Sequence, residues 1–136
     1  MLELVKALCD KEIYEQIGRN LPITAFEREP KRIVETIISA QDTYDNSINL
    51  SELENLFFSN NNSLTKAQED SYRLLFAKMR YAEDISLDVA KDVMHNLWRI
   101  EIGRRVAEIG YALTEGEETS LDSLSKLIDD YASGFV

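Results

Sequence analysis

The chain of 136 residues is 44% hydrophobic and 29% charged, with five glycines and two prolines. This composition is typical of one ordered globular domain with its own core, and it argues against a linker or a disordered tail. The net charge of −10 argues against a surface that grips nucleic acid by itself, because phosphate groups are bound by clustered Lys and Arg side chains.

The first third of the chain predicts three helices. Apolar residues recur at helical spacing over residues 2–9, and Asp10 is a suitable N-cap for a helix over 11–17. Pro30 fits the first position of a third helix, which continues to about Tyr44 and repeats apolar residues on one side. We expect this third helix to be central to the core.

Two helices that begin with a capping box follow. Ser51 with Glu54, and Thr65 with Gln68, match the pattern in which a hydroxyl and an acid or amide three residues later satisfy the first backbone amides. No segment alternates β-branched and polar residues over four or more positions, so the sequence predicts no strand.

The most informative segment is a long helix over 87–113, which Ser86 caps. At about 100° per residue, two apolar stripes lie on different sides of this helix. The first stripe contains Val89, Val93, Leu97, Ile100, Ala107 and Tyr111, and the second contains Met94, Trp98, Ile102, Val106, Ile109 and Leu113. One bundle cannot cover both stripes, so we expect the helix to have two packing partners.

A polar turn over 114–118 leads to a last helix, which Ser120 caps and which carries Leu124, Ile128 and Tyr131 on one side. The long helix and this shorter helix together predict an antiparallel hairpin, because the turn that joins them is short.

A ridge of small residues, Gly103, Ala107 and Gly110, runs along the long helix. Each glycine inside a helix costs about 1 kcal/mol relative to alanine, and close approach of another backbone would offset that cost. Two contacts stay open for the ridge. It packs against the return helix of its own chain, it contacts a second copy of the hairpin, or it does both at different heights along the arm.

No group of residues predicts catalysis. A phosphate-binding loop needs glycines followed by Lys and Ser or Thr, and the chain has no such string. The polar residues over 42–49 lack the central glycine and final glutamate of a calcium loop. We expect His95 to be a solvated imidazole among charged residues, and Cys9 to be a buried thiol. We therefore predict no catalytic, cofactor-binding or metal-ligating residue.

Several absences and the charge distribution bear on the cellular setting. A single cysteine excludes an internal disulfide, and no Cys and His residues have zinc spacing. The first residues lack the features of a secretion signal, and no run approaches the ~18 apolar residues of a membrane span. These features predict a cytoplasmic protein with no membrane contact.

Residues 82–136, with 5 basic and 12 acidic groups, offer an acidic face to a basic partner or serve solubility alone.

Six groups of residues carry a family resemblance: 10–17; Leu21 and Phe26; 31–33 with Ile37 and Ile38; 51–53; 99–105; and Leu121, Leu124 and Ile128. In this order they resemble the N-terminal domain of DnaB-type hexameric replicative DNA helicases, in particular the phage-encoded ones. The resemblance covers nearly the whole chain. It implies a helical bundle with a hairpin that pairs subunits, builds a collar on a hexameric ring and docks primase or a helicase loader.

The same resemblance implies that ATP and magnesium belong to a separate motor domain, so this chain is expected to be one domain of a longer protein located in the cytoplasm of a phage host. The expected architecture is all-α, with a small helical bundle over 1–84, a hairpin arm over 85–132 and the start of a linker or tail over 133–136.

The hairpin is the expected interface. The patch of Trp98, Arg99, Arg104 and Arg105 has the residue types that stack on and grip single-stranded nucleic acid, but Glu101 and Glu108 interrupt it. We therefore expect Trp98 to be an interface anchor, and Arg104 and Arg105 to form salt bridges. The predicted interface consists of Met94, Trp98, Ile102, Val106, Ile109, Leu113, Leu124, Ile128 and Tyr131, with Gly103, Ala107 and Gly110 as points of close helix packing. A free-standing acidic adaptor or inhibitor protein of a phage is the alternative function.

Overall fold

The structure, a computed structural model, describes residues 1–117 and 120–134, with side chains for 1–117 and 121–131. Within these ranges it is all-α as predicted, with seven α-helices, two 3-10 turns and no strand. The elements are α1 (Leu2–Ala7), α2 (Lys11–Ile17), η1 (Gly18–Asn20), η2 (Ile23–Ala25), α3 (Arg28–Thr43), α4 (Leu50–Asn60), α5 (Lys66–Tyr81), α6 (Leu87–Thr114) and α7 (Ser120–Gly134).

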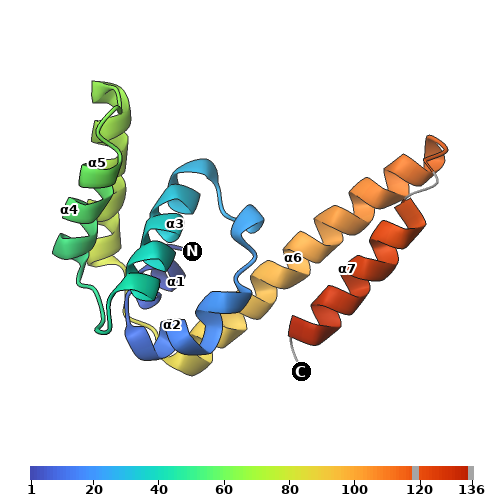
Figure 1. Ribbon diagram of the computed structural model, residues 1–136, viewed down its shortest axis with the longest axis horizontal. Helices are drawn as coiled ribbons and strands as arrows, with labels where there is room; N and C mark the ends of the chain where they lie inside the picture. The colour runs from blue at the N-terminus through green and yellow to red at the C-terminus, as the bar shows by residue number, and fades with distance from the viewer. Residues whose placement is uncertain (118–119, 135–136) are drawn as a thin grey trace.

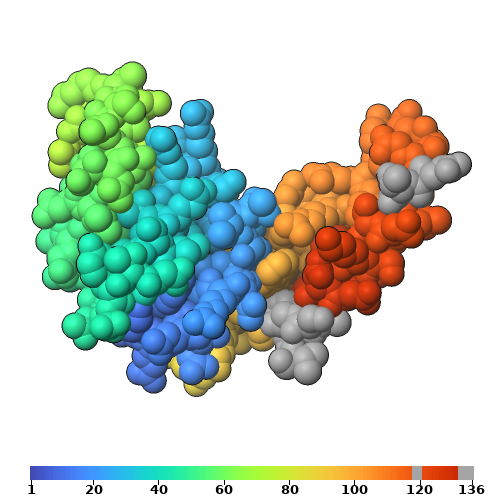
Figure 2. Space-filling view, viewed as in Figure 1, coloured from blue at the N-terminus to red at the C-terminus, as the bar shows by residue number. Residues whose placement is uncertain are grey.

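Two parts are evident in Figure 1, a bundle formed by α1 to α5 and an arm formed by α6 and α7. The first half of α6 runs beneath the bundle and contacts α1, α2 and η2, and its second half leaves the bundle and pairs with α7. Figure 2 shows the arm standing away from α4 and α5. The arm therefore begins midway along α6, later in the chain than the boundary expected at residue 85. The tail expected over 133–136 overlaps the end of α7 and otherwise lies outside the described residues.

The core of the bundle is centred on α3, as predicted. Ile33, Val34 and Ile37 have no exposed surface, because their spacing places all three on one side of the helix. The α4 and α5 pair adds an aromatic cluster in which the Phe57 ring lies 4.6 Å from Tyr72 and 5.5 Å from Phe76, measured between ring centroids. Edge and tilted contacts of this kind stabilise a core beyond the area that they bury.

Local capping sets most helix starts. The Asp10 side chain accepts a hydrogen bond from the Ile13 amide, and the predicted caps at Thr65 and Ser86 are also present. The capping role predicted for Ser120 concerns a side chain outside those described. These bonds satisfy amides that the first turn of a helix leaves without a partner.

Two helix starts differ from the prediction. The capping box of α4 is made by Asn49 and Glu52, two residues before Ser51 and Glu54. Asn is as good an N-cap as Ser, so both pairs match the pattern, and the earlier pair forms the helix start. Pro30 is the third residue of α3 and not the first, which is tolerated because amides in the first turn have no intrahelical acceptor.

The C-terminal end of α3 is joined to the start of the chain by polar contacts. The buried Gln41 side chain donates to the carbonyls of Leu8 and Cys9 at 2.8 and 2.9 Å. The Lys11 ammonium group donates to the carbonyls of Gln41 and Tyr44, where the last turn of the helix carries partial negative charge. These contacts hold α1 and α2 against α3.

Candidate functional site

The arm is anchored by the first half of α6. Ala90, Met94 and Leu97 are buried in the core of the bundle. Trp98 packs against the same core, and its indole Nε1 donates to the Asn20 carbonyl at 2.5 Å. Because the outer half continues the same helix, these contacts fix the position from which the arm extends.

A buried carboxylate, Glu101, marks the point where the arm leaves the bundle. Only 1% of Glu101 is exposed. Its Oε1 accepts hydrogen bonds from Thr24 Oγ1 at 2.7 Å, Arg104 Nη2 at 2.5 Å and Arg105 Nε at 2.9 Å. Arg105 also donates to Thr24 at 3.2 Å, so one carboxylate ties η2 to two arginines of the arm.

The protonation of Glu101 follows from these contacts. Burial alone raises the pKa of its carboxyl group, but hydrogen bonds from Arg104, Thr24 and Arg105 favour the ionised form and bring the pKa below its ordinary value. The predicted salt bridges of Arg104 and Arg105 are confirmed, with Glu108 as a further partner of Arg104 at 2.7 Å.

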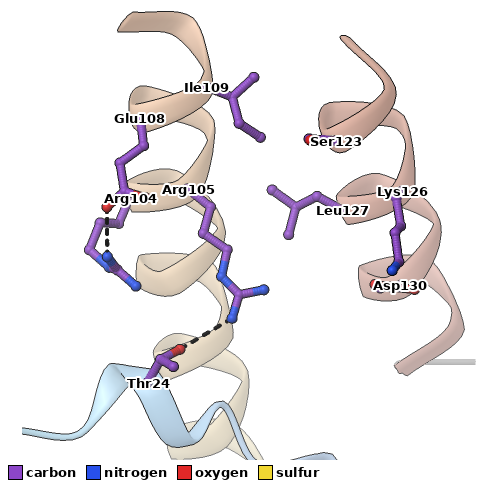
Figure 3. Close-up of a pocket in the computed structure, with 9 residues that line it drawn as sticks. All are labelled: Thr24, Arg104, Arg105, Glu108, Ile109, Ser123, Lys126, Leu127 and Asp130. Carbon is purple, nitrogen blue, oxygen red and sulfur yellow. Dashed lines mark hydrogen bonds and ion pairs between the residues drawn. The ribbon is translucent and has the colours of Figure 1, made fainter. Parts of the chain in front are cut away.

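A groove separates the two helices of the arm on one side (Figure 3). Ile109 and Leu127 point toward each other between the helices, while charged side chains line the opening. The groove measures about 440 Å³ and is lined by Thr24, Arg104, Arg105, Glu108, Ile109, Ser123, Lys126, Leu127 and Asp130. One face of the hairpin is therefore polar and charged.

The opposite side of α6 carries no charge between residues 100 and 114. At 100° per residue, the four charged residues of this stretch, Glu101, Arg104, Arg105 and Glu108, fall within about 100° of arc. The uncharged part of the circumference that α7 leaves open, which we call the outer face of α6, contains Ile100, Gly103, Val106, Ala107, Gly110 and Tyr111. Tyr111 forms its border with the charged side, because it lies seven residues after Arg104. Ile100 and Tyr111 are 67% and 69% exposed, and Val106 is also exposed.

The uncharged surface continues onto α7. Leu121 and Ile128 are both exposed and lie seven residues apart, so they share one line along the helix. In an antiparallel pair that packs Ile109 against Leu127, this line lies on the same side of the hairpin as Val106 and Leu113. The hairpin is therefore charged on one side and apolar on the other.

The structure divides the predicted interface residues into three groups. Met94 is buried in the bundle core and is unavailable to a second copy, which corrects its assignment. Five residues are half-buried against their own chain, namely Trp98, Ile102, Ile109, Leu124 and Tyr131. Three are exposed, namely Val106, Leu113 and Ile128. The cause is the orientation of α6 about its own axis. The start of the stripe, with Met94 and Trp98, faces the bundle, and its later residues face α7.

The glycine ridge is open. A Cβ atom added at Gly103 or Gly110 would have no atom within 4 Å, and Ala107 between them is exposed. The alternative in which this ridge packs against the return helix is therefore wrong. The sequence places Ile100 and Tyr111 on an apolar stripe outside the predicted interface, and the structure adds them because both are exposed.

The remaining candidates for chemistry are metal-binding clusters and the single cysteine. In the described part of the chain, no three His, Cys, Asp or Glu residues are placed to hold a metal ion. Cys9 is buried as predicted, and that burial raises the pKa of its thiol to about 12. Among the described helices, none combines the length and the apolar character needed to cross a bilayer.

Compared with protein-family models, with curated proteins and with solved structures, the chain has no significant match.

Proposed function

We propose that this chain is a non-catalytic assembly module in which the hairpin arm pairs two copies through the outer face of α6. In the setting that the sequence resemblance implies, the module is the N-terminal collar domain of a replicative DNA helicase, and it docks primase or a helicase loader. ATP and magnesium then belong to a separate motor domain. The observation that carries the proposal is the exposed, charge-free face along an arm that stands away from its bundle.

The exposed apolar side chains of the arm offer a free-energy gain comparable to the cost of association. Full burial of a large apolar side chain contributes about 1.5–3 kcal/mol. The six large apolar residues of the described arm that are exposed are Ile100, Val106, Tyr111, Leu113, Leu121 and Ile128. If each gains about 1 kcal/mol, two copies gain about 12 kcal/mol, which lies within the association cost of about 4–15 kcal/mol. Net affinity therefore requires most of these residues to take part.

Gly103 and Gly110 supply the close approach that such a contact needs. Because these two positions have no side chain, a second helix can lie nearer to the α6 backbone there than an alanine or leucine would permit. The larger side chains beside the ridge then pack around the crossing point. This arrangement gives a physical reason for two glycines inside a helix, where each costs about 1 kcal/mol.

Analytical ultracentrifugation of the purified chain tests the pairing. At roughly 0.1 mM protein we expect a dimer or a larger assembly. Ile100→Ser with Tyr111→Ser should weaken association at least about 100-fold, because four apolar side chains are lost from each pair of copies. Tyr81→Ser is the matched control, since Tyr81 is 90% exposed but lies on the bundle. A monomeric wild-type chain, or equal effects of the two changes, would contradict the proposal.

The helicase assignment has a separate test in the gene that encodes this chain. A reading frame that continues past Val136 into a domain with a phosphate-binding loop supports a collar domain. A stop codon directly after Val136 contradicts it, whatever the outcome of the pairing experiment.

The net charge of −10 favours a second candidate, a free-standing acidic adaptor or inhibitor protein of a phage. An acidic surface attracts a basic partner through long-range electrostatics that salt screens. Salt-sensitive binding of a basic host protein by a monomeric chain would support this function in place of the first.

A further inference from the structure

A hollow of about 650 Å³ lies where the loop after α3 meets the first turns of α4, formed by residues 44–48 together with 52, 55, 56 and 59. This volume is within the range of about 300–1,000 Å³ that is usual for ligand pockets. Ile48 is buried and Leu56 is half-buried in its wall, while the polar side chains around them are exposed. Figure 1 shows α4 on the side of the bundle away from the arm, so this site, which we call the acidic hollow, is separate from the outer face of α6.

The charged groups of the acidic hollow are carboxylates. Asp45 and Glu52 line it, and no Lys, Arg or His is among its lining residues. Lys11 contacts the same loop, but its ammonium group donates to the carbonyls of Gln41 and Tyr44 and does not line the hollow. The wall therefore combines two negative charges with apolar surface. This combination favours a cation that also has an apolar part.

Several oxygen atoms of the hollow are open to a ligand. The side chains of Asp45 and Asn55 form no hydrogen bond or ion pair in the part of the chain that the structure describes. Glu52 uses Oε1 to accept from the Asn49 amide at 3.1 Å in the capping box of α4, and its second oxygen has no donor there. A ligand with several N–H groups would satisfy these oxygen atoms together.

The loop that carries these groups is held in place by its own chain. Ser47 Oγ accepts a hydrogen bond from the Lys11 amide at 2.8 Å, and the Ile48 amide donates to the Cys9 carbonyl at 3.1 Å. The capping box fixes the facing end of α4. Because the wall needs little ordering on binding, even a small contact keeps most of its favourable free energy.

The chemistry of the wall favours a guanidinium group. Among the described residues, no three His, Cys, Asp or Glu are placed to hold a metal ion, and the carboxylates repel a phosphate backbone. Tyr44, also in the wall and 53% exposed, offers an aromatic ring to a cation. A guanidinium group has five donors in a planar fork that matches carboxylate oxygens and stacks on aromatic rings, whereas an ammonium group has three donors and no planar face.

We propose that the acidic hollow binds an arginine side chain from a basic segment of a partner protein. The guanidinium group pairs with Asp45 and Glu52, and the aliphatic stem packs on Ile48 and Leu56. The net charge of −10 makes a basic protein the source, because long-range attraction steers it toward this chain and repels a second copy. The inference goes beyond hairpin pairing and does not depend on it.

Titration with short peptides, followed through the backbone amide shifts of the whole chain in NMR spectra, tests the proposal. The probes are a blocked alanine peptide with one central arginine, and the same peptide with lysine or with citrulline, which has the shape of arginine but no charge. At about 10 mM salt we expect the arginine peptide to bind with a Kd of about 1 mM and to shift amides within residues 44–59. The lysine peptide should bind about threefold more weakly, and the citrulline peptide at least about tenfold more weakly.

Two substitutions that keep the local structure locate the site. Asp45→Asn retains a good turn residue, and Glu52→Gln retains the capping box, because glutamine also serves at that position. Together they should weaken binding of the arginine peptide at least about tenfold. Asp122→Asn with Asp129→Asn is the matched control, since it removes the same charge from exposed positions on α7 and should change the Kd less than about twofold.

Four results would each overturn the inference. They are no binding of the arginine peptide, shifts that map outside residues 44–59, equal binding of the citrulline peptide, and a control that acts like the paired substitutions. Tighter binding of spermidine at the same amides would overturn it in favour of a small polyamine. Shifts at these amides that grow with chain concentration alone, and that Asp45→Asn with Glu52→Gln removes, would overturn it in favour of a second copy.

Discussion

Replacing Glu101 by glutamine tests how the arm is held to the bundle. The carboxylate is 1% exposed and accepts hydrogen bonds from Thr24, Arg104 and Arg105. Glutamine preserves the shape and one acceptor oxygen, but it removes the charge and turns an NH₂ group toward a guanidinium donor. We expect the variant to fold and to be less stable.

The size of the effect follows from the exposure of the partners. Losing one member of a fully buried ion pair costs about 3–5 kcal/mol. The side chains of Arg104 and Arg105 are 49% and 36% exposed, so water replaces part of what they lose. We therefore expect Glu101→Gln to lower the free energy of unfolding by about 2 kcal/mol, and to lower Tm by roughly 6–8 °C in a domain of this size.

Urea and thermal unfolding followed by circular dichroism and by the fluorescence of Trp98 measure this change. Trp98, the one tryptophan of the chain, lies one helical turn before Glu101 and reports the junction directly. Glu108→Gln is the matched control, because Glu108 also pairs with Arg104 but is 62% exposed, and its loss should cost less than about 0.5 kcal/mol. Equal effects of the two substitutions would refute the reasoning.

Four further predictions use the same measurements or a simple labelling assay. Because the pKa of Glu101 is lowered in the folded chain, its stabilisation is complete above about pH 4.5 and is lost as the pH falls through the lowered pKa; acid titration should therefore destabilise wild type more than Glu101→Gln. Gly18→Ala should lower the free energy of unfolding by about 1–3 kcal/mol, because its Cβ would collide with the Tyr14 ring. Gly103→Ala should raise the free energy of unfolding of the monomer by up to about 1 kcal/mol, because the added Cβ would have no atom within 4 Å. A thiol reagent at pH 8 should label Cys9 only after unfolding, since the folded thiol has a pKa of about 12 and is buried; rapid labelling of the folded chain would contradict its burial.

Helix starts were predictable where the signal is local. At Asp10, Thr65 and Ser86 the capping side chain accepts a hydrogen bond from the backbone amide three residues later. The capping residue is therefore visible in the sequence itself. The start of α4 was misplaced because Asn49 and Ser51 begin equally good patterns. Tertiary packing, and not propensity, decides between such neighbours.

The environment of Glu101 was not predictable from the sequence. With arginines at i+3 and i+4, it has the pattern of an exposed helical ion pair. Its burial depends on Thr24, which is 77 residues away in the chain, and no local signal marks that contact. The rotation of α6 was hidden for a similar reason, since both of its stripes are apolar and only the packed structure shows which one faces inward.

The continuity of α6 has a mechanical consequence. Its 28 residues make a rod of about 42 Å, and no proline or other break separates the part inside the bundle from the part that projects. A tilt of the bundle therefore moves the tip of the arm. The projecting 13 residues after Glu101 span about 20 Å, so a tilt of about 10° at the base displaces the tip by roughly 3 Å. A ligand that shifts the bundle thereby repositions whatever the far end of the rod holds.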